Sequence, residues 1–473
     1  MVSFILPGNS ATGGYEVDNS LRFNSASDDN LSRTPSSASN RKTFTISAWV
    51  KKANLGTTQT IIDARIDSND NCSIFFNDDD NIFIKFKVSP TSQNTSLTTS
   101  RKFRDVSAWY HIVLAVDMTQ GTDTNRVKFY VNGVQETSFS SATYLAQNTD
   151  TTYNNTNEHQ LGSRVADTTQ DLDGYMAEFV MVDGQALDPT SFGEFDEDSP
   201  TIWKPIDVSG LTFGTNGFYL DFENSGSLGA DVSGNGNNFT VNNLTSIDQS
   251  TDTCTNNFLT WNPLDTTDPG DLTFSEGNLK VVNGTGVCRG TLAASSGKWY
   301  WEIKQITAVD ASNPIQYGVA DTEDSPPTHS SLNNALIAYS DNNTNKAIKK
   351  FAAGTESTIT STMGSFNNIA QNDIIQFAFD ADTAKLWVGR NGTYLNSGDP
   401  ANGTGEVAST NSGNFFTPCL EHAGVTYTIE SNFGSPPYSI SSGNSDANGH
   451  GNFEYAVPSG FFAWNTKNLA EFG

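Results

Sequence analysis

Two short segments of this chain carry the strongest short-range signal for a β-hairpin: alternating apolar residues, then Asn-Gly, then a short return. They are residues 127–134 (VKFYVNGV) and 384–394 (AKLWVGRNGTY). Asn-Gly favours a type I′ turn, because both central residues of that turn need positive φ. Each hairpin comes late in a long block of strand and turn patterns. The chain is therefore predicted to be all-β, with two antiparallel β-sandwich (jelly-roll) domains in tandem.

Length and composition agree with this prediction. The 473 residues are too many for one ordinary domain. Hydrophobic residues make up only 36%, but 30 Phe, 14 Tyr and 8 Trp provide the large side chains of two cores. Long stretches of good helix formers are missing, so we expect little helix.

The net charge of -27 excludes nucleic acid as an expected partner, since a like-charged polymer is repelled. Acidic side chains could bind divalent cations, or they could simply be scattered over a solvated surface. The four cysteines show no CxxC pair and no zinc-site spacing, so we expect buried free thiols: Cys72, Cys254, Cys288 and Cys419.

Nothing at the N-terminus resembles a signal peptide, and no segment approaches the roughly 20 apolar residues of a membrane span. We therefore expect synthesis in a cytoplasm and no membrane insertion. The expected organisation is an N-terminal arm (1–18), a first β domain (19–198), a connector packed on the sandwiches (199–265) and a second β domain (266–473). The connector loop 231–241 lacks the spaced carboxylates of an EF-hand and is not assigned calcium.

The first β domain resembles the laminin G-like family, with its concanavalin A-like jelly roll. The matching segments, in order, are SLRF (20–23), FTISAWVK (44–51), WYHIVLAVD (109–117), VKFYVNGV (127–134), LG (161–162) and DGYMAEFVMVDGQAL (173–187). The resemblance implies binding of carbohydrate or protein, often with calcium. Calcium is therefore the one cofactor left open, and its candidate ligands are Asp78, Asp79, Asp80, Asp171 and Asp173, which could equally be solvated turn residues.

The second β domain resembles the SPRY (B30.2-like) family. The shared pattern is GKWYWEI (297–303), YGVA (317–320), an Asp-x-x-x-Phe strand from 373 that leads into the second hairpin, FTPC (416–419) and NFG (432–434). This resemblance implies a non-enzymatic domain that binds proteins or peptides through loops. It also implies that Trp299 and Trp301 lie in the core, although exposed rings could stack on sugars.

Catalytic arrangements are weak throughout the chain. Residues 194–199 (EFDEDS) come nearest to the paired carboxylates of a glycosidase, but Ser199 stands where a second Glu is needed. His111 lies in an apolar strand and is expected to be a core or interface residue. We therefore predict that the protein is not an enzyme and has no catalytic residues.

The order of the two domains and the sequences of three particular segments resemble virion proteins of marine bacteriophages. The resemblance rests on the start SFILPGNSATGGYEVDNSLRFN (3–24), the connector GNGNNFTVNN (234–243) and the step NPLD (262–265). It implies a fibre, appendage or decoration protein located in the virion, homo-oligomeric, with other virion proteins as partners. Its loops would bind a host-surface glycan or protein. The alternatives are a purely architectural decoration protein and, more remotely, a polysaccharide-degrading enzyme.

Overall fold

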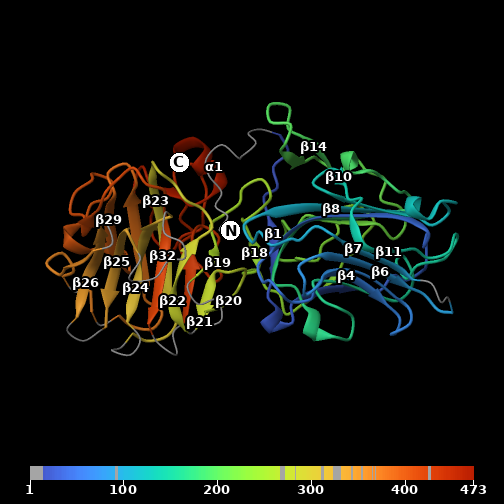
Figure 1. The fold of residues 1–473 in the computed structure, drawn as a ribbon, viewed down its shortest axis with the longest axis horizontal. Helices are drawn as coiled ribbons and strands as arrows, with labels where there is room; N and C mark the ends of the chain where they lie inside the picture. The colour runs from blue at the N-terminus through green and yellow to red at the C-terminus, as the bar shows by residue number, and fades with distance from the viewer. Residues whose placement is uncertain are drawn as a thin grey trace. The chain divides into compact units, whose positions relative to one another are not determined.

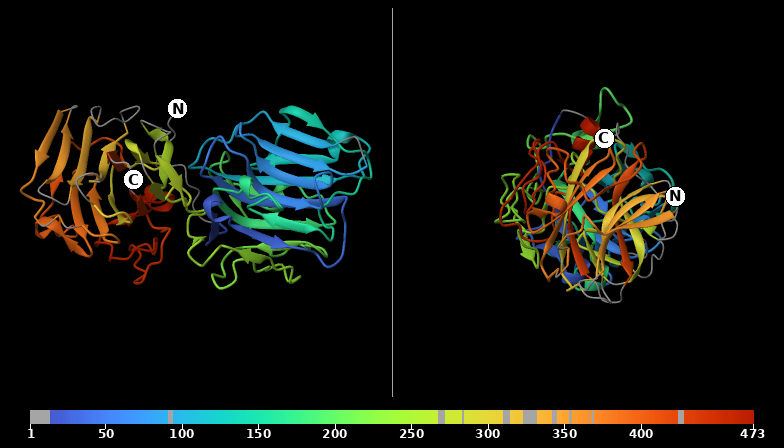
Figure 2. Two further views of the ribbon diagram at one scale, coloured as in Figure 1. Left: turned by 90° about the horizontal axis from the view of Figure 1, so that it is seen from below. Right: turned by 90° about the vertical axis from the view of Figure 1, so that its left-hand side faces the viewer.

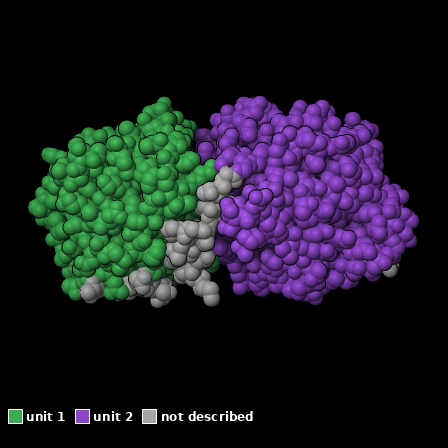
Figure 3. Space-filling view, turned by 90° about the horizontal axis from the view of Figure 1, so that it is seen from above, with its two compact units in different colours: residues 1–10, 256–473 green, residues 11–255 purple. Residues whose placement is uncertain are grey.

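The computed structural model describes residues 14–90, 94–266, 272–282, 284–309, 314–322, 332–341, 345–352, 355–364, 366–367, 369–423 and 428–473. These residues form two compact units, 11–255 and 256–473, which Figure 3 shows in purple and green. Strand accounts for 43% of the structure and helix for 5%, which confirms the all-β prediction. No helix in the described ranges has the length and apolar character needed to cross a membrane.

Two antiparallel sheets form the first unit (Figure 1). Sheet I contains β1 (Ser20–Phe23), β3 (Thr43–Lys52), β8 (Trp109–Asp117), β9 (Val127–Val131), β10 (Val134–Gln135), β13 (Gly174–Asp183), β16 (Phe218–Leu220) and β18 (Gln249–Ser250). Its order is β10-β9-β8-β3-β13-β1-β18, and β16 pairs with β13.

Sheet II of the first unit contains β2 (Asn30–Arg33), β4 (Gln59–Arg65), β5 (Asn71–Phe76), β6 (Ile82–Lys87), β7 (Thr95–Thr99), β11 (Phe139–Thr143), β12 (Glu158–Leu161) and β17 (Thr240–Asn242). Its order is β11-β7-β6-β5-β4-β12-β2-β17. A small ribbon pairs β14 (Gly193–Phe195) with β15 (Trp203–Pro205). Short 3-10 turns are η1 (Ser25–Ser27), η2 (Asp123–Asn125), η3 (Thr168–Gln170) and η4 (Pro189–Ser191).

Alternation along the strands builds the core between these two sheets. In β6, Ile82, Ile84 and Phe86 are fully buried, while the residues between them face away from the core. In β3 the same alternation sends Phe44, Ile46, Ala48 and Val50 into the core, as the sequence predicted. Because successive side chains of a strand point to opposite faces of the sheet, only every second residue of each strand faces away from this core and is available to bind a ligand.

The outer face of sheet I is also covered, in two places. One apolar cluster joins Val180 and Val182 of β13 to Phe192, Val208 and Phe213 of the chain that follows. A second cluster gathers the aromatic side chains of Trp49, Trp109, Tyr175 and Trp203 with Val17.

The stretch 199–255, expected as part of a connector, supplies β15 to the small ribbon and three further strands to the two large sheets of the first unit. β16 pairs with β13, β17 pairs with β2, and β18 pairs with β1. The last part of the expected connector, from Asn256, lies in the second unit. Of the expected N-terminal arm, residues 1–13 lie outside the described ranges. The Tyr15 hydroxyl lies 3.0 Å from that of Tyr219 and donates a hydrogen bond to Glu178 at 3.3 Å.

Two further sheets form the second unit (Figure 2). Sheet III has the order β19 (Trp261–Thr266), β22 (Thr285–Gly290), β32 (Phe416–Ala423), β24 (Ile315–Asp321), β25 (Asn334–Ser340), β26 (Lys346–Ala352) and β27 (Thr355–Ile359). Sheet IV has the order β20 (Thr273–Ser275), β21 (Lys280–Val282), β33 (Thr428–Asn432), β23 (Lys298–Gln305), β28 (Ile374–Asp380), β29 (Lys385–Arg390) and β30 (Thr393–Tyr394). At its margins, β31 (Ala408–Ser409) pairs with β29, and β34 (Phe462–Ala463) pairs with β23. A short 3-10 turn, η6 (Leu395–Ser397), follows β30, and the helix α1 (Thr466–Phe472) is the last element of the chain.

The aromatic run in β23 packs as predicted. Trp299 and Trp301 lie in the core of the second unit, where Trp299 stacks on Trp464 with ring centroids 4.5 Å apart. Tyr300 points to the opposite face of the sheet and joins a separate apolar cluster. These rings are therefore unavailable for stacking on sugars.

Both Asn-Gly turns have the expected backbone. Asn132 and Gly133 have φ of 47° and 77°, and Asn391 and Gly392 have 48° and 83°. Gly133 is required for a second reason, because a Cβ there would meet the ring of Trp203 at 2.3 Å. The first hairpin therefore lies directly beneath the side chain that covers it.

Candidate binding pocket

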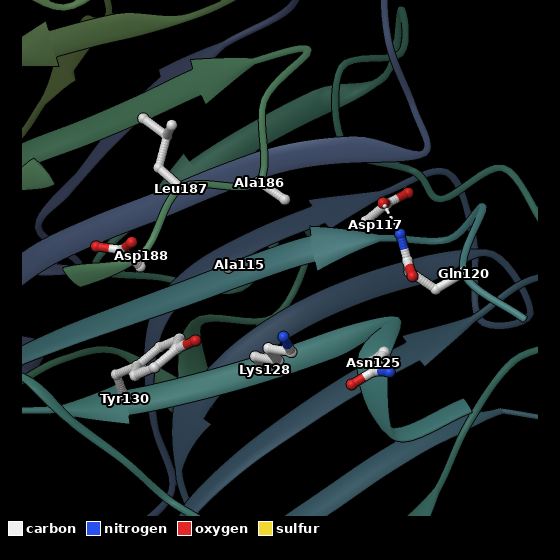
Figure 4. Close-up of a pocket in the computed structure, with 9 residues that line it drawn as sticks. All are labelled: Ala115, Asp117, Gln120, Asn125, Lys128, Tyr130, Ala186, Leu187 and Asp188. Carbon is white, nitrogen blue, oxygen red and sulfur yellow. Dashed lines mark hydrogen bonds between the residues drawn. The ribbon is translucent and has the colours of Figure 1, made fainter. Parts of the chain in front are cut away.

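A pocket of 370 Å³ lies on the outer face of sheet I, over β8 and β9 (Figure 4). Its lining is mostly polar and comes from two strands and two loops. The lining residues are Ala115, Asp117, Gln120, Asn125, Lys128, Tyr130, Ala186, Leu187 and Asp188.

Strand alternation explains why polar groups point into this space. β8 buries Leu114 and Val116 in the core, so Ala115 faces outward. On β9, Lys128 lies directly opposite Ala115 in the register. The small side chain of Ala115 leaves room beside Lys128, and that room is the floor of the pocket.

The loops complete the walls. The turn between β8 and β9, which contains η2, contributes Gln120 and Asn125. The loop after β13 is fixed by Thr45, whose hydroxyl accepts a hydrogen bond from the backbone N–H of Leu187 at 2.8 Å and donates to the carbonyl of Gln185. This anchoring holds the 186–188 loop at the pocket wall.

The carboxylate of Asp117 is fixed at one end of the pocket. It accepts hydrogen bonds from the hydroxyl of Thr119 and from the Gln120 amide, both at 2.6 Å, and Figure 4 shows the second. Burial acts to raise the pKa of Asp117, but these hydrogen bonds outweigh burial and hold the pKa below its usual value. Asp117 is therefore a charged acceptor at neutral pH.

Three other groups in the pocket have no hydrogen-bond partner among the described residues. They are the ammonium of Lys128, the side-chain amide of Asn125 and the hydroxyl of Tyr130. Burial, together with the charge of Asp188, raises the pKa of Tyr130, so its hydroxyl stays protonated. The pocket thus offers free donors and acceptors next to an aromatic ring, a combination that suits the hydroxyl groups and apolar faces of a saccharide.

The sequence-derived calcium candidates in the loop after β5 have protein partners or lie in solvent. Asp80 is buried and bonds Lys52 at 2.7 Å, Arg104 at 3.0 Å and the N–H of Gly56. Asp79 is exposed and lies 3.7 Å from Lys102, and Asp78 is exposed. This loop does not form a cation site, because its one buried carboxylate is already neutralised.

The other two candidates differ sharply from each other. Asp173 accepts hydrogen bonds from the N–H and hydroxyl of Ser25, at 2.9 and 2.8 Å. Asp171 is 3% exposed, and neither of its carboxylate oxygens makes a hydrogen bond of full geometry to the described residues, although the side chains of Ser163 and Asp28 lie close to it. Burial raises the pKa of Asp171 to about 6, Ser163 acts to lower it, and the nearby carboxylate of Asp28 adds to the rise.

A buried carboxylate that lies beside a hydroxyl group and a second carboxylate fits a hard divalent cation, which prefers oxygen ligands. Asp171 and Asp28 would hold such an ion, with charge neutralisation as its contribution. No group of three or more His, Cys, Asp or Glu with metal-site geometry occurs within the described ranges. Backbone carbonyls or water would therefore have to complete the coordination.

The glycosidase-like string 194–199 has a structural role in the ribbon of β14 and β15. Glu194 and Asp196 both pair with the ammonium of Lys204, at 3.4 and 3.3 Å. Backbone N–H groups of Asp198 and Ser199 also donate to Asp196. The two carboxylates thus share one cation, the ammonium of Lys204.

His111 is a core residue, as the sequence predicted. Its Nδ1 accepts a hydrogen bond from the indole of Trp203 at 2.9 Å, and its Nε2 lies 2.8 Å from the hydroxyl of Ser47. Complete burial lowers the pKa of His111 to about 3, so the ring is neutral. The four cysteines are free thiols, and all but Cys254 are buried.

Sequence reasoning did not single out the pocket residues. Lys128 and Tyr130 stand in the first Asn-Gly hairpin, where alternation with Val127, Phe129 and Val131 already placed them on the outward face. That signal marks them as outward, but only the fold brings the 186–188 loop beside them.

Comparison with known proteins places the first unit. Residues 25–191 match the laminin G model described as the concanavalin A-like lectin/glucanases superfamily. No curated protein matches the chain.

Several solved structures resemble the chain weakly. They include the SPRY domain of human HERC1 (13% identity, 36% of this chain and 96% of that one, TM-score 0.27). Domains LG4-5 of the mouse laminin alpha1 chain share 8% identity over 91% of this chain and 92% of theirs, with a TM-score of 0.29. A putative carbohydrate-binding protein from Bacteroides ovatus shares 16% identity over 48% and 59%, with a TM-score of 0.31. These similarities are too low to assign a function, and the family match alone identifies a concanavalin A-like jelly-roll domain of the laminin G type in the first unit.

Proposed function

We propose that this protein is a non-enzymatic structural component of a bacteriophage particle, a fibre, appendage or decoration, that binds a host-surface glycan through its first unit. The pocket on sheet I is the proposed glycan site. The SPRY-like second unit would present its loops to a protein partner. The protein would be made in the host cytoplasm and located in the virion as a homo-oligomer.

The observation that carries the proposal is the set of unpartnered groups in the pocket. Lys128, Asn125 and Tyr130 face a common space without protein partners, beside the fixed carboxylate of Asp117. Polar groups in a folded protein normally find partners, so groups left free and convergent in a pocket favour an external ligand. A saccharide supplies several hydroxyl groups at the spacing of one ring.

The phage assignment is supported by the sequence alone. The sequences of residues 3–24 and 234–243 resemble those of marine phage virion proteins. The high net negative charge of the chain also suits a particle that must stay dispersed in salty surroundings. Calcium, held by Asp171 and Asp28, would stabilise the jelly roll without touching the pocket residues.

A glycan array with host-envelope and algal polysaccharides tests the glycan site. We expect wild-type protein to bind at least one glycan and Lys128→Gln to weaken that binding roughly 10-fold or more, because a hydrogen bond to a charged group contributes about 1.5–3 kcal/mol. Tyr130→Phe should weaken it about 5-fold, the value of one neutral hydrogen bond. Lys102→Gln, which removes an exposed lysine paired with Asp79, is the matched control and should bind as wild type does.

Failure to bind any glycan would overturn the glycan site and favour the architectural alternative, in which the sandwiches contact only viral neighbours. Equal binding by wild type and Lys128→Gln would place the glycan elsewhere. Light scattering of the purified protein tests the homo-oligomer, and a monomer at micromolar concentration would contradict it.

A further inference from the structure

A group of cations lies on the opposite sheet of the first unit, away from the pocket. In β6, Lys85 and Lys87 alternate with the core residues Ile84 and Phe86 and therefore face outward from sheet II. Arg65, at the end of β4, lies on the same face, because Asn71 pairs with both Arg65 and Lys87 in the register. These three side chains come from neighbouring strands of one surface.

Arg164 joins them from the loop after β12. The N–H of the next residue, Val165, donates to Asp63, and Asp63, Ser73 and Lys85 lie side by side on three neighbouring strands, so Arg164 is near this face. Burial lowers the pKa of Lys85, and the positive charges of Arg164, Lys87 and Arg65 lower it further, while the charge of Asp63 acts in the opposite direction. We call Arg65, Lys85, Lys87 and Arg164 the basic patch of sheet II.

Four cations on one surface are unusual in a chain with so few basic residues. Lys and Arg number only 26 against 53 Asp and Glu. Lys85 and Arg65 nevertheless have no ion pair and no side-chain hydrogen bond among the described residues. Lys87 bonds only the carbonyl of Ser68 and the amide oxygen of Asn69, and Arg164 is the one member with an acidic partner, Asp167 at 3.3 Å.

Two carboxylates lie on the same face as the basic patch. Asp63 lies opposite Ser73, which in turn lies opposite Lys85, and Asp63 accepts hydrogen bonds from the hydroxyl of Ser73 and, at 3.1 Å, from the N–H of Val165. Burial raises the pKa of Asp63, while the positive charges of Arg164 and Arg65 act to lower it. Glu158 lies opposite Arg65 in the register and accepts from the amide of Gln160 at 2.9 Å. Among the described residues, neither carboxylate accepts a hydrogen bond from Lys85 or Arg65, so the donors of these two cations are free for a ligand.

An aromatic pair continues the same face. Phe75 and Phe83 lie opposite each other on β5 and β6, with ring centroids 4.9 Å apart. Both rings are half-buried and belong to no hydrophobic cluster of the described residues. Phe83 precedes Lys85 by two residues on one strand, so the two side chains leave the same face of the sheet from positions about 7 Å apart.

We propose that the basic patch and the Phe75–Phe83 pair form a second binding site, for an oxyanion (sulfate ester or carboxylate) carried on a polysaccharide. The rings would contact the apolar face of a sugar, while Lys85 and Arg65 bind its anionic group. This site is independent of the pocket on sheet I and does not require it. A nucleic acid fits less well, because its closely spaced phosphates would extend beyond four cations onto a strongly acidic protein.

The test measures binding of the full chain to three polysaccharides by calorimetry: a sulfated galactan, the same galactan after desulfation, and a polyuronate. We expect binding of at least one anionic polymer and none of the desulfated galactan, and the anionic arms distinguish sulfate from carboxylate. Lys85→Gln with Arg65→Gln should weaken binding at least 10-fold and flatten its dependence on salt. Phe83→Ala should weaken it several-fold without changing the salt dependence.

Lys102→Gln is the control, because it removes the same charge from an exposed position outside both proposed sites and should leave this binding unchanged. A loss with Lys102→Gln that equals the loss with Lys85→Gln would overturn the second site, and a loss with Lys128→Gln alone would place the polysaccharide in the pocket on sheet I instead. Absence of binding to both anionic polymers would also overturn it, as would equal or tighter binding of single-stranded DNA through the same residues. Thermal unfolding of each variant verifies that lost binding is not lost folding.

Discussion

Calcium is expected to stabilise the first unit through Asp171, and Asp171→Asn is expected to abolish that effect. Asp171 is 3% exposed, and neither carboxylate oxygen makes a hydrogen bond of full geometry to the described residues, with only Ser163 and Asp28 close to it. Each buried polar group left unsatisfied costs about 1–3 kcal/mol. A cation that binds only the folded unit recovers this cost, by about 2.7 kcal/mol when its concentration is 100 times its dissociation constant.

Thermal unfolding in EDTA and in saturating calcium measures the effect. For a unit of this size, each kcal/mol changes Tm by about 2–4 °C, so we expect calcium to raise Tm by about 5–10 °C. Asp171→Asn should unfold at the same temperature with calcium as with EDTA. In EDTA it should be no less stable than wild type, because a neutral amide is easier to bury than a carboxylate.

Asp173→Asn is the matched control. Its carboxylate has partners on Ser25, so the substitution should lower the free energy of unfolding by about 1–2 kcal/mol, equally with and without calcium. Our reasoning is refuted if wild-type protein shows the same Tm in both conditions. It is also refuted if Asp171→Asn keeps the full response to calcium.

Two further predictions concern the second unit. Asp265→Asn should destabilise it by about 3–5 kcal/mol in urea unfolding, because buried Arg289 loses the charge of Asp265, to which it is bonded at 2.7 and 2.9 Å. As a control, Asp79→Asn, at an exposed pair of the first unit, should change stability by less than about 1 kcal/mol. Burial raises the pKa of Glu302 to about 7, so the free energy of unfolding should fall by about 2.5 kcal/mol as pH rises from 5 to 8. Glu302→Gln should remove this fall. A wild-type stability that rises through this range relative to the variant would contradict the prediction.

Much of the fold could be predicted from local patterns. The alternation of Phe44 to Val50 and the Asn-Gly turn at 132–133 each determine a conformation within a few residues, and the structure contains both. The partners of β16, β17 and β18 could not be predicted, because each of these strands has two or three residues and pairs with a strand that is distant in the sequence. Leu220 of β16, for example, pairs with Phe179 of β13.

The candidate sites were less predictable for the same reason. Asp171 and Asp173 are two residues apart, yet Ser25 donates two hydrogen bonds to Asp173, whereas Asp171 is buried beside Ser163 and Asp28. Lys128 and Lys85 were each placed on an outward face by alternation alone. Their groupings with Tyr130 and with Arg164 arise from loops that cross the sheets, which a strand pattern does not specify.

Non-catalytic glycan binding is tested most directly with a host-surface polysaccharide that the protein binds. The protein is incubated with this polysaccharide, and both the bound protein and the reducing ends released are measured. We expect saturable binding that Lys128→Gln weakens about 10-fold, with reducing ends at the level of a protein-free control. Release of reducing ends that rises with time and protein concentration would contradict the central claim that these sandwiches bind without catalysis.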